Sequence, residues 1–300
     1  RTYYDLGADR IVGEDLPGCN DIQVRGNYEA SPTTRLTLFG MRSRESGDAT
    51  FTGDGTDSGA FTTAATNDVY GLRARSFFGT RVSSTLALAY YEFAQTLAVD
   101  AQFEDGSRRS NARVNTTQIN VAFDQTIATR DLSLRNDWSF ALSPTNLLEA
   151  GFEAHRLRTG ATYNISGERN LSEANPSSNR GGAALPDAYD EQVPSNRWGA
   201  WVQNRMTMGK RLSAEAGLRL SRSSITGNVE VEPRLSLLLR GSDTWRWRAA
   251  YGSHSQSPGI EKLLQSDYFL DLSTLGLRNE RSRHATLGFE KDFPSVSLKA

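Results

Sequence analysis

Apolar and polar residues alternate along most of the chain, and helical periodicity is almost absent. The clearest stretch runs from Leu212 to Leu220, where every second residue is apolar and the intervening residues are small or charged. Because successive side chains of a β-strand point to opposite sides, this stretch has one apolar wall and one polar wall. The pattern therefore predicts two-faced β-strands over much of the chain.

The same division recurs in other segments of similar length. Many of them approach the roughly 9–11 residues that a tilted strand needs to cross a bilayer, whereas strands of soluble sandwiches average about 5–6 residues. Their polar walls carry full charges at several depths, which a water-filled lumen accepts. These segments are 21–29, 131–142, 148–155, 234–240, 245–252 and 284–290.

Short turns and long polar stretches alternate between the predicted strands, as they do in an outer-membrane barrel. Loops this long would argue against a compact soluble domain. Residues 109–127 also alternate, but a membrane strand there would put two short turns in succession on opposite sides. We therefore place them in a long extracellular loop, as a hairpin that rises above the membrane. The expected turns are 31–33, 79–81, 143–146, 209–210, 241–244 and 293–294, and the expected loops are 10–20, 46–67, 99–130, 163–195, 223–230 and 255–280.

Aromatic residues lie near many predicted strand ends, where amphipathic rings favour the boundary between hydrocarbon and headgroups. Ordinary packing in a soluble β core is the alternative explanation. The residues are Tyr90, Tyr91, Phe93, Trp138, Phe140, Trp198, Trp201, Trp245, Trp247 and Tyr251.

The composition changes this picture little. The chain has 300 residues, 37% of them hydrophobic, and a mean hydropathy of −0.52. These values resemble a soluble protein, but only every second strand residue of a barrel faces lipid. Its 34 basic and 35 acidic residues argue against a nucleic-acid partner. No apolar run reaches the roughly 18 residues of a transmembrane helix.

The stretch from Val231 to Glu290 resembles the distal barrel of TonB-dependent receptors. A "PRL" strand, a "YG…QSP" strand end and an "ERS…H…LG.E" strand recur in that family in this order. They correspond here to 233–235, to 251–258 and to 280–290. The resemblance implies a receptor in the outer membrane of a Gram-negative bacterium, with a barrel of about 22 strands and an N-terminal plug. Such receptors import scarce solutes, such as iron–siderophores, vitamins or glycans, with energy from an inner-membrane TonB complex.

The predicted fold is therefore all-β, an antiparallel up-and-down transmembrane barrel with long extracellular loops and short periplasmic turns. We count about 13 spanning strands of a likely 22. Residues 1–300 are expected to be a barrel fragment truncated at both ends, because both ends read as mid-strand and we find neither a plug nor a TonB-binding box. The implied partners are outer-membrane lipid, the receptor's own plug, the TonB complex through that plug, and a small solute.

No catalytic constellation is apparent, so we expect no enzyme, no cofactor and no metal site. The three histidines are far apart in the sequence, and Cys19 is the one cysteine. The segment from Gly53 to Asp57 suggests calcium only weakly, because it lacks the twelve-residue ligand pattern with its terminal Glu. Ser257 and Pro258 have the chemistry of a helix start within a long loop.

Four arginines are the candidate contact residues, because the register directs all of them into the lumen: Arg219, Arg234, Arg246 and Arg248. In one interpretation they contact the plug or guide an anionic solute, since like charges in a low-dielectric channel focus the field. In the other they pair with lumen acids such as Glu215 and Glu290 and solvate the wall.

Three other classes of protein remain as alternatives. A passive porin-like channel would have the same lumen, and a plug-like domain upstream would distinguish the receptor from it. A soluble β-sandwich or propeller that binds glycans or partners would be extracted without detergent. An outer-membrane enzyme would need a nucleophile and a base that the spacing does not provide.

Overall fold

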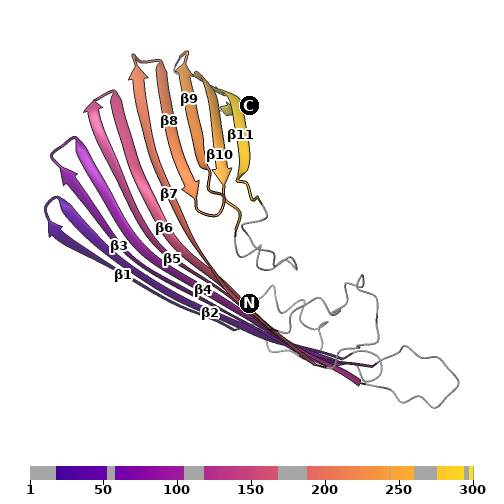
Figure 1. Cartoon of the computed structure of the whole chain (residues 1–300). Helices are drawn as coiled ribbons and strands as arrows, with labels where there is room; N and C mark the ends of the chain where they lie inside the picture. Colours follow the sequence, from indigo (N-terminus) through magenta and orange to yellow (C-terminus); the bar gives the residue numbers. More distant parts are fainter. Residues whose placement is uncertain are drawn as a thin grey trace.

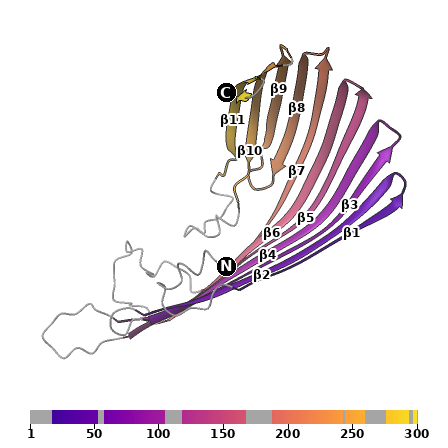
Figure 2. The same cartoon turned by 180° about the vertical axis from the view of Figure 1, so that it is seen from behind.

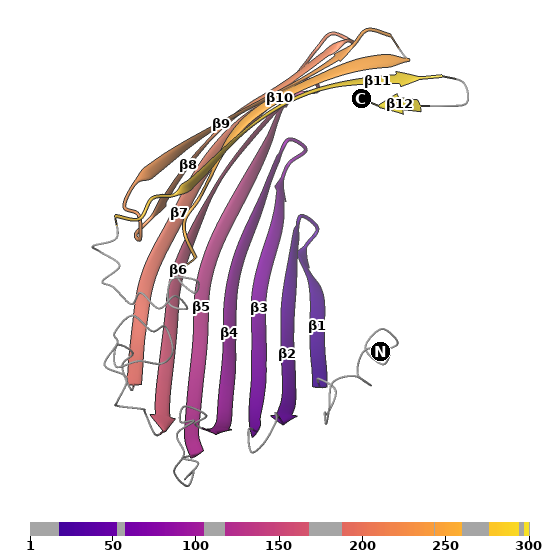
Figure 3. The same ribbon diagram turned by 90° about the vertical axis from the view of Figure 1, so that its right-hand side faces the viewer.

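The protein forms a single curved sheet of twelve antiparallel strands, each paired with the next along the chain. The computed structural model describes residues 18–52, 58–104, 118–167, 188–242, 244–259, 276–293 and 297–299. The sheet curves as part of a barrel wall (Figures 1 and 3), which confirms the predicted all-β, up-and-down architecture. The strands are β1 (Gly18–Ser31), β2 (Thr34–Thr52), β3 (Ser58–Phe78), β4 (Val82–Glu104), β5 (Gln118–Ser143), β6 (Asn146–Gly167), β7 (Ala188–Met208), β8 (Leu212–Ser223), β9 (Val229–Arg240), β10 (Trp245–Gln256), β11 (Glu280–Asp292) and β12 (Ser297–Lys299).

The convex face of the sheet is apolar, as the alternation predicts. Leu38, Leu72, Leu88 and Leu134 lie side by side on successive strands, and all four are exposed. Leaving a leucine in water instead of an apolar environment costs about 1.5–3 kcal/mol. A row of exposed leucines is therefore favourable where it contacts the acyl chains of lipid.

The described residues contain no second layer that could cover this face. Their only buried apolar side chains are Ala101, Ile127 and Ala161. A sandwich would bury its leucines between two facing sheets, which excludes that alternative for the described residues. None of them forms a helix long and apolar enough to cross a membrane.

The tight turns line one rim of the sheet (Figures 1 and 2). They join β1 to β2, β3 to β4, β5 to β6, β7 to β8, and β9 to β10, at the positions expected from the sequence. Gly79 and Gly209 have positive φ angles of 65° and 63°, a conformation that glycine adopts without steric cost. This rim carries the connections predicted to be periplasmic.

Successive tight turns are offset along the sheet. Ser76 pairs with Thr34, the first residue of β2, but β3 continues to Phe78 before it turns. In the same way Met206 pairs with Asn146, the first residue of β6, while β7 continues to Met208. Each of these turns thus begins two residues beyond the level of the preceding one.

The described part of the loop expected at 99–130 is not irregular but paired as strands, which agrees with a hairpin that rises above the membrane. β4 runs unbroken to Glu104, and β5 pairs with it from Gln118 onward. Beyond the bilayer no lipid faces the convex side, but pairing between neighbouring strands still satisfies the hydrogen-bonding groups of the backbone. The apolar residues accordingly change faces, from Leu88 on the convex side to Leu97 on the concave side. β2, β3, β6 and β7 similarly extend into the loops expected at 46–67 and 163–195.

Charged residues replace apolar ones on the convex face where the wall of leucines ends. We call Arg42, Asp68, Glu92, Arg130 and Arg158 the outer charged row, because they lie side by side on β2 to β6. Arg42 donates two hydrogen bonds of 2.7 Å to Asp68, and Arg130 donates one of 2.7 Å to Glu92.

The outer charged row lies outside the apolar band. On β4 the convex positions from Val82 to Tyr90 precede Glu92, which fits the roughly 9–11 residues of a bilayer crossing. Hydrogen bonds from Arg42 lower the pKa of Asp68. Those from Tyr90 and Arg130 lower the pKa of Glu92. Both carboxylates therefore stay ionised at neutral pH.

The remaining predictions concern small features. Cys19 lies in β1 and is exposed, not in a loop. No group of three or more metal-ligating side chains occurs among the described residues. The candidate calcium loop from Gly53 to Asp57 lies outside the described residues. Ser257 to Gly259 are not helical, and the rest of the expected helix also lies outside them.

Candidate functional site

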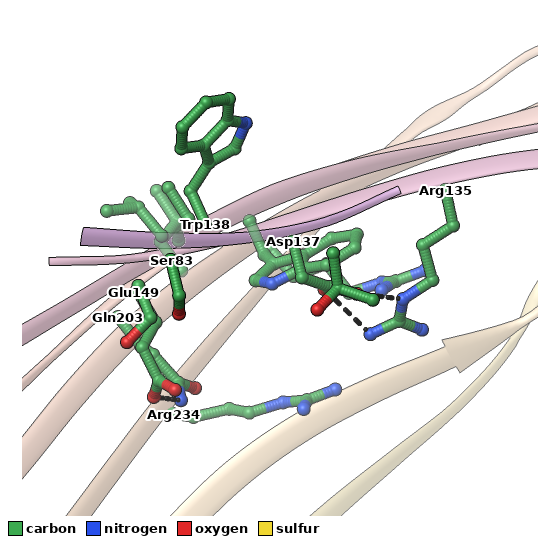
Figure 4. A pocket seen from close by; sticks show the side chains of 15 residues that line it. Ser83, Arg135, Asp137, Trp138, Glu149, Gln203 and Arg234 are labelled. Carbon is green, nitrogen blue, oxygen red and sulfur yellow. Dashed lines mark hydrogen bonds and ion pairs between the residues drawn. The ribbon is translucent and has the colours of Figure 1, made fainter. Parts of the chain in front are cut away.

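The concave face carries the polar and charged side chains of the sheet. A hollow of about 520 Å³ opens on it between β4 and β9, lined by residues that include Arg135, Glu149, Trp201 and Arg219. Figure 4 shows Arg135 and Asp137 on one side of β5 and Trp138 on the other. The period-two pattern of the sequence thus divides this strand as expected.

An ion-paired aromatic cluster contributes several of the side chains that line the hollow. Trp201 on β7 has the Cζ atom of Arg135 at 4.7 Å and that of Arg219 at 5.4 Å from its ring centroid. Glu153 on β6 forms ion pairs with both guanidinium groups, at 3.6 Å from Nη1 of Arg135 and in a close contact with Arg219. Arg135 also bonds to Asp137 at 2.8 Å. The cluster ties four adjacent strands together.

Two glycines allow the large side chains of this cluster to lie flat on the sheet. A Cβ atom at Gly151 would lie 2.3 Å from the Trp201 ring and 2.7 Å from the backbone oxygen of Asn136. A Cβ atom at Gly199 would lie 2.9 Å from Nη2 of Arg219. Both glycines therefore provide space that any other residue would fill.

Replacing Gly151 with alanine is expected to destabilise the barrel by about 1–3 kcal/mol, the usual cost of overpacking a closely packed site. Moving the ring alone cannot relieve the clash, because the Asn136 contact is with backbone. In SDS gels of samples incubated at increasing temperatures, the midpoint at which the fast-migrating folded form disappears should be lower than for wild type. Gly26→Ala is the control, since nothing lies within 4 Å of its Cβ position. Equal midpoints for the two variants would contradict the account.

A second cluster surrounds the buried carboxylate of Glu232 on β9. It accepts hydrogen bonds from Ser255 at 2.7 Å and from Ser221 at 3.2 Å. Nη2 of Arg234 lies 3.4 Å away. These partners come from three strands and satisfy a charge that burial would otherwise disfavour. The cluster therefore stabilises the wall beside a second hollow of about 450 Å³.

All four candidate arginines lie on the concave face, but they do not form one cluster. Arg219 and Arg234 line the central hollow. Arg246 and Arg248 lie on β10 towards the tight-turn rim, and both pair with Glu290. The expected acid Glu215 pairs with Arg205 instead, at 2.7 Å.

The four arginines differ in how much of each side chain is free to meet another molecule. Arg219 and Arg246 are 25% and 35% exposed, whereas Arg234 and Arg248 are 50% and 58% exposed. Arg234 and Arg248 also have the longer ion pairs, at 3.4 and 3.5 Å. Contact with a plug or solute stays a prediction, and these two side chains are the better placed for it.

Sequence reasoning missed several residues of the wall. The sequence predicts a place at the membrane boundary for Trp201, Tyr91 and Phe93, but the register puts them on the concave face. The available signal was that each of them lies an odd number of residues from Trp198 or Tyr90, and therefore on the opposite face of the strand. His155 with its partner Asp131, 2.9 Å apart, carried no signal of its own.

Comparisons with known proteins agree with this geometry. The family described as "TonB dependent receptor-like, beta-barrel" matches residues 20–300, while no curated protein matches the sequence. The RagAB peptide transporter superposes with a TM-score of 0.58 at 9% identity, over 92% of this chain and 38% of that one. The siderophore receptor PiuA from Acinetobacter baumannii gives 0.52 at 10% identity, over 94% and 54%. This chain therefore spans about 38–54% of the length of these proteins.

Proposed function

This chain belongs to the TonB-dependent receptor β-barrel family of the Gram-negative outer membrane, and we propose that it forms the wall and outer vestibule of a receptor for TonB-coupled uptake. The imported solute would be a scarce one, such as an iron–siderophore, a vitamin, a glycan or a peptide. The receptor's own plug would close the lumen, and the TonB complex would act through that plug. The chain itself supplies no chemistry in this proposal.

One observation carries the proposal: the two faces of a single layer of strands differ. The convex face has exposed leucines, and the concave face has polar residues, ion pairs and hollows. Lipid solvates the first face, and water or a solute solvates the second. The solved structures support the same arrangement of strands, and at 9–10% identity they support the fold alone. Those two proteins are a peptide transporter and a siderophore receptor, which guides the choice of solutes to test.

The test is uptake by the full-length receptor in cells that lack their own receptors for the solutes. Radiolabelled ferric siderophores, short peptides, a vitamin and an oligosaccharide would be compared in strains with and without TonB. We expect accumulation of one of these classes only when TonB is present. Equal accumulation in both strains would identify a passive channel and reject the proposal.

The most exposed wall arginines offer a finer test of solute contact. Arg234→Gln and Arg248→Gln should raise the half-saturating concentration of an anionic solute by about tenfold, if each guanidinium contributes one charge-assisted hydrogen bond. Arg75→Gln is the control, because Arg75 is also exposed on the concave face but lies on β3, several strands away from β9 and β10, with its guanidinium group over the Phe77 ring. Unchanged uptake in both variants would assign these arginines to solvation of the wall.

A further inference from the structure

Three arginines crowd together on the convex face of β5 and β6. Arg130 and Arg158 are direct cross-strand partners in the outer charged row, so their Cβ atoms lie about 4.5–5.5 Å apart. Arg156 lies two residues from Arg158 and therefore on the same face. All three are exposed. Like charges directly opposite each other destabilise a sheet, so this arrangement requires an explanation.

Acidic neighbours among the described residues do not neutralise this group. Glu92 bonds to Arg130 at 2.7 Å. Neither Arg156 nor Arg158 has an ion pair with any described residue. The next acids on the convex face are Asp124, six residues above Arg130 on β5, and Asp190 on β7, which pairs with Thr162 four residues above Arg158. These are about 20 Å and about 13 Å along the strands, beyond the screening length of about 8 Å at physiological salt. We call Arg130, Arg156 and Arg158 the arginine triplet, and it has a net positive charge.

The triplet lies at the outer edge of an apolar surface that faces lipid: Arg156 pairs with Leu132, while Arg130 and Arg158 lie one step further out on the same face. Leu132 and Leu134 continue the convex face of β5 towards the turn rim, and Ala154 and Trp198 lie beside them on β6 and β7. Leu132 and Trp198 are both exposed. The tight turns are at the opposite rim (Figure 3), so the triplet marks the outer boundary of the band. Acyl chains would lie on the apolar surface and headgroups at the level of the triplet.

The chemistry of the triplet matches phosphate. A guanidinium group presents a planar fork of donors that binds phosphate through two hydrogen bonds. Basic residues at a membrane surface attract anionic headgroups. An anion between Arg130 and Arg158 would also remove the like-charge repulsion of that pair.

We propose that the arginine triplet is a binding site for the phosphate groups of an anionic outer-leaflet lipid, whose acyl chains lie on the apolar surface formed by Leu132, Leu134, Ala154 and Trp198. The site is on the opposite face of the wall from the solute path, so it does not depend on which solute is imported. It would fix one lipid against β5 to β7 and hold the barrel at a defined depth.

The test compares Arg156→Gln/Arg158→Gln with wild type in the full-length receptor, purified in mild detergent. These two positions are chosen because neither side chain has an ion pair among the described residues that the change would break. Diphosphoryl lipid A is the probe, and native mass spectrometry measures its occupancy. We expect affinity to fall at least about tenfold, because several charge-assisted hydrogen bonds are lost.

Arg73→Gln/Arg75→Gln is the matched control. These arginines are also exposed and two residues apart on one strand, but they face the concave side. The control should bind the lipid as wild type does, and both variants should keep the wild-type mobility of unheated samples in SDS gels. Equal loss in the control, or unchanged binding in the triplet variant, would overturn the proposal.

Two further ligands distinguish the source of the phosphate. Lipid A without its phosphates should bind the wild type and the triplet variant equally weakly. If it binds the wild type as tightly as the phosphorylated form does, the apolar surface alone accounts for binding and the proposal fails. Inorganic phosphate at the concentration of the lipid should not displace it. Complete displacement would show a site for free phosphate and would also reject a lipid site.

Discussion

Leu86→Arg is expected to destabilise the folded barrel in lipid by about 2–4 kcal/mol, the cost of an arginine on the lipid face near the middle of the bilayer. Leu86 lies on the convex face of β4, midway between Val82, the first residue of the strand, and Tyr90, and it is exposed. The guanidinium group has no water to solvate it at that depth. Denaturant titration of the protein folded into vesicles measures the effect.

Ala89→Arg on the same strand is the matched control. Ala89 faces the concave side, where its cross-strand neighbours are Gly71 and Ser133, and it borders a hollow. There is room for the long side chain, and water in the lumen solvates its charge. We therefore expect a change of less than about 1 kcal/mol, as for an ordinary surface substitution. If Ala89→Arg were the more harmful change, the assignment of the two faces would be reversed.

The second large effect is expected at Glu153. Among the described residues, this carboxylate is the one acid that forms ion pairs with both Arg135 and Arg219, the two arginines beside Trp201. Glu153→Gln would leave two guanidinium groups in a partly buried cluster without their shared counter-charge. We expect a loss of about 2 kcal/mol in unfolding free energy, because a group that has lost its charged partner keeps its desolvation penalty. Trp201 fluorescence should also change.

Glu149→Gln provides the comparison, because Glu149 lies four residues away on the same face of β6 and contacts a neutral partner. It accepts a hydrogen bond of 2.7 Å from Gln203, and a glutamine there can accept the same bond. Its effect should be within about 0.5 kcal/mol, as for a surface substitution. In a double-mutant cycle, Arg219→Gln should recover part of the loss caused by Glu153→Gln. Full additivity would show that the two side chains are independent.

The hairpins and the two faces of each spanning strand could be predicted from the sequence. In Leu212 to Leu220 the period-two pattern continues without interruption, and the turn residues before and after it define its ends. Turns such as Gly79 to Arg81 and Gly209 to Lys210 were found where glycine predicted them. Local chemistry determines these features, so one sequence is sufficient to derive them.

The length of the strands could not be predicted in the same way. The apolar residues move to the concave face between Leu88 and Leu97, so a search for a continuous apolar convex wall ends there. Above that level the strand is held by its ladder hydrogen bonds and by contacts such as that between Ile127 and Ala161. Those contacts join residues far apart in the sequence, and the pattern of one strand does not show them.

The candidate site was predictable only in part. That Arg219 faces the lumen follows from its position in the alternation. That Glu153 is its partner does not, because the two residues lie on strands separated by β7. The contact requires the register of three strands, and also Gly199 beneath the arginine. Register depends on the pairing of whole hairpins, which a single strand's sequence does not specify.

The offset of the turns also sets the inclination of the wall. A displacement of two residues, as from Ser76 to Phe78, is about 6.6 Å along the strand, while two strands occupy about 9.6 Å across the sheet. Their ratio corresponds to a slope of about 35° between the strands and the axis of the cylinder, at the lower end of the range for outer-membrane proteins. A solute that moves straight down the lumen therefore passes side chains from several neighbouring strands in turn, and successive contacts are contributed by different hairpins.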